Sequence, residues 1–169
     1  MPIRDSFLPE LDFEMKSTRA TLERVPDDKL GWRPHAKSMT LGRLASHLAE
    51  LPGWGAMTIQ TDSMNMAPAT GDAPKPANLG SRQEILALLD QNIETFREAL
   101  AGCSDERMMG TWTLLAGETT VMAMPRMAVL RTWVMSHLVH HRAQLGVYLR
   151  LNDIPLPPVY GPSADEGKM

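Results

Sequence analysis

The sequence lacks the features that would place it outside the ordinary globular proteins. Its one cysteine, Cys103, excludes an intrachain disulfide framework and suits a reducing compartment. Its 17 basic residues are scattered and its net charge is −3, which argues against a nucleic-acid-binding surface. No apolar run approaches the length of a membrane span, and the first residues lack the apolar segment of a signal peptide. We therefore expect a cytoplasmic protein with neither a nucleic-acid nor a membrane partner.

What is present fits one globular domain over residues 1–169. Hydrophobic residues make up 43% of the chain and charged residues 22%, which excludes a disordered chain. A chain of this length can bury an ordinary core without disulfides or other cross-links. Methionine is frequent, with 13 residues, and three of the five histidines lie between positions 137 and 141.

Apolar residues recur at helical spacing in four segments of the chain. The first covers about 2–25, the second about 41–60 after a cap at Thr40, and the fourth about 125–151. The third begins at a capping box, Ser81 to Glu84, and ends before Gly102. Pro52 predicts a kink or a break within the second helix.

The segments between these helices carry little strand signal. Residues 61–80 predict a long surface loop, and residues 108–124 predict a small hairpin or an irregular loop. From about residue 152 the proline-rich tail is expected to be extended or disordered, and frayed beyond Gly161. The fold class predicted is all-α, an up-down four-helix bundle with long connecting loops.

Two histidines of the fourth helix fall within its apolar stripe. At 100° per residue, His137 and His141 lie one turn apart on the buried face, whereas His140 lies at its rim. Such a pair brings two imidazole nitrogens to one place, where they can bind one metal ion if another helix supplies a third ligand.

The remaining histidines are unequal candidates for that third ligand. His35 lies in a linker beside Pro34, whereas His47 lies at the edge of the buried face of the second helix. The residues alone leave a second interpretation open, in which these histidines are hydrogen-bonded packing residues.

Three stretches resemble a known family. They are VPDDKLGWRP (25–34), MTLGRLASHLAELPGW (39–54) and HLVHHRAQL (137–145), and they resemble the DinB/YfiT-like superfamily of metal-dependent four-helix proteins. The resemblance covers nearly the whole chain. It implies a metal triad of His47, His137 and His141, and a homodimer.

Three neutral histidines leave a divalent ion with open positions, which is typical of catalytic sites. The ion expected is zinc or nickel, with iron, manganese or copper as alternatives. Such an ion acidifies a bound water or thiol. The resemblance implies thiol S-transfer to a small-molecule substrate with a low-molecular-weight thiol as cosubstrate, and metal-assisted hydrolysis is the close alternative. A third hypothesis, from another class, is a non-catalytic bundle that binds a small ligand or a partner and holds a structural metal.

Other residues near the histidines have two interpretations each. Gln144, Glu50 and His140 are candidates for supporting the metal ligands, although Glu50 and His140 also fit solvated surface positions and Gln144 also fits an interhelical hydrogen bond. Three tryptophans are candidates for the wall of a pocket or for ordinary core: Trp54, Trp112 and Trp133.

Overall fold

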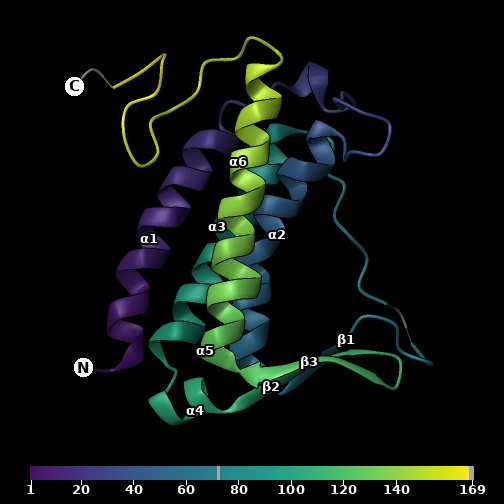
Figure 1. Ribbon diagram of the computed structural model, residues 1–169, viewed down its shortest axis with the longest axis vertical. Helices are drawn as coiled ribbons and strands as arrows, with labels where there is room; N and C mark the ends of the chain where they lie inside the picture. Colours follow the sequence, from purple (N-terminus) through teal and green to yellow (C-terminus); the bar gives the residue numbers. More distant parts are fainter. Residues whose placement is uncertain (72, 168–169) are drawn as a thin grey trace.

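A computed structural model describes residues 1–71 and 73–167, which are mostly helical (Figure 1). The long helices are α1 (Ile3–Leu22), α2 (Leu41–Gln60), α3 (Arg82–Ala101) and α6 (His137–Arg150). The shorter elements are η1 (Asp27–Lys29), α4 (Asp105–Met109), α5 (Arg126–Val129), the π-helical segment η2 (Leu130–Ser136), and the strands β1 (Ser63–Asn65), β2 (Thr111–Ala116) and β3 (Thr119–Pro125). Among the described residues, no helix is both long enough and apolar enough to cross a bilayer.

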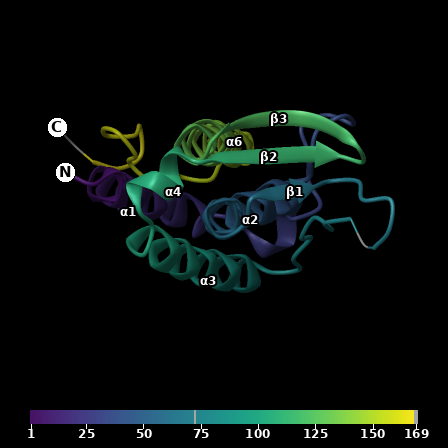
Figure 2. The same cartoon turned by 90° about the horizontal axis from the view of Figure 1, so that it is seen from below.

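The long helices lie side by side and enclose an apolar core. Helix α2 packs against α3 and α6, and α1 packs against the same two helices on the other side (Figures 1 and 2). The amphipathic pattern of each helix directs its apolar face to this centre. Among the fully buried core residues are Phe7, Leu11, Leu48, Leu89, Phe96, Leu138 and Leu145.

Helix α2 has the boundaries that the sequence predicts, but it is continuous where a break was one expectation. Its first turn is capped by the Thr40 hydroxyl, which accepts the Arg43 N–H at 3.2 Å. The helix continues through Pro52 to Gln60. A Cβ atom at Gly55 would lie 2.5 Å from the Phe96 ring, so this glycine permits the close approach of α3.

The expectation of an all-α chain needs correction, because three strands form a small sheet. Strands β2 and β3 form an antiparallel hairpin, one of the two alternatives for residues 108–124, and Gly117 has a φ of 63° in its turn. Strand β1, within the segment predicted to be a loop, pairs parallel with β2. The sheet lies at one end of the helices (Figure 1).

A buried arginine fastens this sheet to the helices. Arg126, at the start of α5, is 2% exposed. Its guanidinium donates to the carbonyl oxygens of Thr58, Gly110 and Thr61 at 2.8–3.1 Å and also contacts the Asp62 carboxylate. Arg126 thereby holds together the C-terminal end of α2, the residues that directly follow it, and the residue that directly precedes β2.

The fourth predicted helix is less regular than its sequence pattern suggests. Residues 126–150 are helical throughout, but Leu130–Ser136 form a π-helical segment directly before His137. A π-helical segment changes the angle between residues on either side of it, which a uniform 100° wheel does not include. Because His137 and His141 both follow the segment, their mutual spacing remains that of a regular helix.

The C-terminal tail, from about residue 152, contacts the helices over its described part to residue 167. Tyr160 contacts Arg142 of α6 and Glu14 of α1. Further along, Asp165 pairs with Arg150 and accepts the Leu156 N–H at 2.9 Å. These contacts join residues that are far apart in sequence and of ordinary polar type, so no local pattern predicts them.

Candidate metal centre

Three histidine side chains meet between α2 and α6. His47 comes from α2, and His137 and His141 come from the first two turns of α6. The Nε2 atom of His137 lies 3.3 Å from that of His47 and 2.8 Å from that of His141. His47 and His141 are buried and His137 is half-buried, so solvent reaches the cluster on the His137 side.

The other ring nitrogen of each histidine faces a hydrogen-bond acceptor. The Nδ1–H of His47 donates to the Glu50 carboxylate at 3.2 Å, and that of His137 to the main-chain carbonyl of Trp133 at 3.2 Å. The Nδ1–H of His141 donates to the side-chain oxygen of Gln144 at 2.7 Å. A carbonyl or carboxylate oxygen cannot donate, so these partners assign the proton to Nδ1 in each ring.

In the neutral form of each ring this tautomer leaves Nε2 without a proton, and the three Nε2 atoms point at one another. With the protons on Nδ1, no hydrogen bond joins the Nε2 atoms, and their lone pairs repel across the short separations between them. A cation between them removes that repulsion. Two imidazole nitrogens on one ion, each at about 2.0–2.1 Å, are about 2.9 Å apart at a right angle and about 3.3 Å apart at a tetrahedral angle. The Nε2 separations of 2.8 and 3.3 Å lie close to these two values, so the donor set fits a transition-metal ion.

The surroundings keep two of the histidines neutral. Burial lowers the pKa of His141 to about 4, against the opposing effect of its hydrogen bond to Gln144. Burial and the neighbouring His47 lower the pKa of His137 below its ordinary value, against the effect of its bond to Trp133. Neutral imidazole is the form that binds metals, so both residues are in a ligating state at neutral pH.

Glu50 connects the cluster to the segment between β1 and α3. Besides the Nδ1–H of His47, its carboxylate accepts a hydrogen bond from Arg43 at 3.1 Å and one from the main-chain N–H of Ala77. Partial burial alone would raise the pKa of this carboxyl, but these hydrogen bonds and the charge of Arg43 bring it below its ordinary value. Glu50 is thus an ionised acceptor that orients His47.

The other candidate supporting residues take different positions. Gln144 is an exposed residue and its side chain bonds directly to His141. His140 is exposed; its ring centroid lies 4.9 Å from that of His141, and it does not belong to the group of converging donors. With His137, it borders an open depression on the surface of α6. His35 is exposed in the η1–α2 connection.

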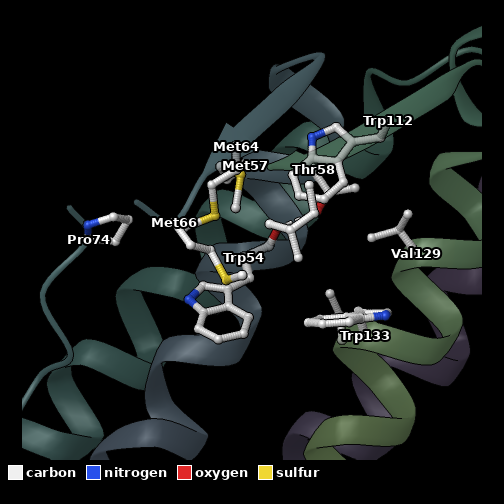
Figure 3. A pocket seen from close by; sticks show the side chains of 11 residues that line it. Trp54, Met57, Thr58, Met64, Met66, Pro74, Trp112, Val129 and Trp133 are labelled. Carbon is white, nitrogen blue, oxygen red and sulfur yellow. Dashed lines mark hydrogen bonds between the residues drawn. The ribbon is translucent and has the colours of Figure 1, made fainter. Parts of the chain in front are cut away.

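The three candidate tryptophans line one cavity of about 200 Å³ beside the histidines (Figure 3). Trp54 comes from α2, Trp112 from β2 and Trp133 from η2. The Trp54 ring centroid lies 5.4 Å from that of His47 and 5.9 Å from that of His137. The cavity and the histidine cluster therefore share a wall.

Some contributors to the site are not visible in the sequence. The Trp133 carbonyl is a main-chain group, and Ala77 acts through its N–H, so neither residue type gives a signal. Arg43 gives a weak sequence signal, because it lies seven residues before Glu50, two turns along the same face of α2.

Comparisons with known proteins agree with this fold. The sequence model of the DinB superfamily matches residues 10–145. An uncharacterized protein of Bacillus subtilis, YrdA, is 30% identical over 162 residues, which cover 96% of this chain and 90% of YrdA. Among solved structures, a DinB-like protein from Bacillus cereus has a TM-score of 0.71 at 23% identity, covering 92% of this chain and 97% of its own. A DinB-like protein from Bacillus subtilis has a TM-score of 0.64 at 17% identity, covering 92% and 94%.

Proposed function

The chain belongs to the DinB superfamily, and on that premise we propose that it is a metal-dependent enzyme. In this proposal His47, His137 and His141 hold a divalent transition-metal ion, zinc or nickel before iron, manganese or copper. The reaction is transfer of a low-molecular-weight thiol to a small-molecule electrophile, and hydrolysis of such a molecule is the second candidate.

One observation carries the proposal: three Nε2 atoms converge while each Nδ1–H is held by an acceptor. Acceptors behind metal-binding histidines fix the ring and the tautomer. A cluster formed only by packing has no need to expose three lone pairs to one another, since a buried polar group is normally satisfied.

The number of donors favours catalysis over a structural metal. Within the described residues, the group of donors around the cluster contains three side chains, whereas structural zinc sites are closed by four. A bound ion would polarise an electrophile or lower the pKa of a thiol or a water molecule. The residues around it hold the ligands: Glu50 orients His47, Gln144 orients His141, and the Trp133 carbonyl orients His137.

A thiol-dependence assay separates the candidate reactions. The zinc-loaded protein is incubated with 1-chloro-2,4-dinitrobenzene alone and with cysteine or glutathione, and with 4-nitrophenyl acetate for hydrolysis. Thiol transfer predicts a rate above the uncatalysed one that rises with thiol concentration and disappears in His137→Ala. A rate that is independent of thiol would contradict transfer and favour hydrolysis.

The non-catalytic alternative has its own test. In a crystal structure of the zinc-loaded protein, we expect three protein ligands. A fourth protein ligand that closes the coordination sphere would contradict the enzyme proposal and favour a structural metal in a binding protein.

A further inference from the structure

None of the side chains that line the cavity beside the histidines is charged. Three methionines from different segments contribute to it: Met57 from α2, Met64 from β1 and Met66 from the residues that follow β1 (Figure 3). Flexible methionine side chains adapt to apolar ligands of different shape. A charged group placed here would lose part of its hydration without gaining a partner of opposite charge.

Two of the polar groups in the lining already form hydrogen bonds with other residues of the protein. The Thr58 hydroxyl donates to the Trp54 carbonyl at 2.8 Å, and the Trp112 indole N–H donates to the Thr61 hydroxyl at 3.2 Å. Neither donor is free to recognise a polar group of a ligand. Apart from the indole N–H groups of Trp54 and Trp133, the cavity therefore presents apolar surface to a ligand.

The cavity adjoins the candidate metal centre through Trp54 and Trp133. The Trp54 ring contacts the rings of His47 and His137, and the Trp133 carbonyl accepts the Nδ1–H of His137. Figure 3 shows these two indoles toward one end of the pocket, on α2 and on η2, with Met64 and Trp112 toward the other end. A molecule that fills the cavity lies beside the histidine cluster.

The volume limits the size of that molecule. A dry apolar cavity of about 150 Å³ accepts benzene. At about 200 Å³, this cavity has room for a substituted benzene ring or an aliphatic group of similar size.

We propose that the substrate of this site has an uncharged, apolar body about the size of a benzene ring, which fills this cavity, and a donor group directed at the histidines. The proposal rests on the proposed function for the donor group, but the binding of the apolar body does not depend on a metal. The electrophile or the thiol that carries this body is therefore an aromatic or aliphatic molecule without charge at that end.

The first experiment tests whether the apolar body binds in the absence of a donor group. Toluene and benzylammonium have similar shape and differ in charge, and their binding to metal-free protein is followed by tryptophan fluorescence and by ligand-observed NMR. We expect saturable toluene binding and benzylammonium binding that is weaker by at least about tenfold. Equal affinity for both probes, or no saturable toluene binding, would overturn the proposal.

Matched methionine variants locate the binding. Met57→Gln and Met64→Gln keep the side-chain length but add an amide, and each should weaken toluene binding by roughly fivefold or more. Met109→Gln, at an exposed methionine of α4 outside the cavity, is the control and should bind toluene as the unchanged protein does. Circular dichroism shows that each variant is folded, and an unchanged toluene Kd in both folded cavity variants would contradict the assignment.

A final comparison separates this proposal from the proposed function. In the zinc-loaded protein, benzyl mercaptan should bind at least about tenfold more tightly than toluene, because its sulfur is a soft donor for the ion. His137→Ala should remove that advantage. If zinc binds but toluene does not, the substrate proposal fails alone; if toluene binds but zinc does not, the metal-dependent function fails alone.

Discussion

His141 and Arg142 are consecutive residues of α6 and both are buried, but the hydrogen-bond partners around their polar atoms differ. The Arg142 guanidinium donates to the Glu14 carboxylate at 2.6 Å, to the Thr18 hydroxyl at 3.2 Å and to the Tyr160 hydroxyl at 2.6 Å. The Tyr160 hydroxyl donates in turn to the Glu14 carboxylate at 3.0 Å. In this cluster both terminal nitrogens of Arg142 and the Tyr160 hydroxyl face acceptors.

In the histidine cluster only the outer ring nitrogens, the Nδ1 atoms, have hydrogen-bond partners of the opposite kind. Its Nδ1–H groups have acceptors, but its three Nε2 atoms face one another and all carry lone pairs. A buried polar cluster in which donors face acceptors makes the fold sensitive to the loss of any one partner, whereas a cluster that brings only lone pairs together at its centre is suited to a cation. The comparison assigns stability to the Arg142 cluster and function to the histidine cluster.

Arg142→Ala should have the largest effect on stability. It leaves the buried Glu14 carboxylate without its guanidinium, and breaking a buried ion pair in this way costs about 3–5 kcal/mol of unfolding free energy. Urea denaturation measures the change, and the metal content of the folded fraction should not fall. Arg97→Ala, which removes an exposed pair with Asp12, should cost no more than about 1 kcal/mol. Equal costs for the two variants would contradict the assignment of stability to the Arg142 cluster.

Glu50→Ala should weaken zinc binding by about 10- to 100-fold, because His47 loses the acceptor that orients it. Competition with a fluorescent zinc chelator gives the affinity. Glu50→Gln should lose less, since its amide oxygen can still accept the Nδ1–H of His47. The control is Glu98→Ala, on the exposed face of α3. Zinc affinity that is the same in Glu50→Ala and in the control would show that Glu50 has no part in the metal centre.

Tyr160→Phe should have the smallest effect, and only on stability. It removes a hydroxyl that bonds to Arg142 and Glu14 but keeps the ring stacked on Phe13, so we expect a loss of about 0.5–1.5 kcal/mol in urea denaturation. The matched control is Tyr148→Phe, whose hydroxyl is 3.4 Å from its acceptor at an exposed position and should matter less. A fall in zinc affinity in Tyr160→Phe would mean that the two clusters are coupled through α6.

Short-range signals account for what the sequence predicts well. Thr40 and Ser81 cap the helices that they were expected to begin, because a cap depends on neighbouring residues alone. The placement of His137 and His141 on one face likewise depends on a spacing of four residues. The position of His47 required the packing of α2 on α6, which the apolar faces indicate only in outline.

Long-range pairing accounts for what the sequence does not reveal. Strand β1 has three residues and becomes a strand only because β2 lies beside it, and the Glu50–Ala77 bond joins residues 27 positions apart. The π-helical segment before His137 also has no local sequence signal that we recognise. Assembly as a homodimer and a cytoplasmic location stay predictions.

Metal content tests the central claim most directly. The protein, His137→Ala and His140→Ala are purified without an affinity tag, equilibrated with zinc, freed of excess metal and subjected to elemental analysis. We predict about one ion per chain in the unchanged protein and in His140→Ala, and less than about half an ion per chain in His137→Ala. Circular dichroism confirms that all three are folded. Less than about half an ion per chain in the unchanged protein, or a content that His137→Ala does not lower, would contradict the metal centre.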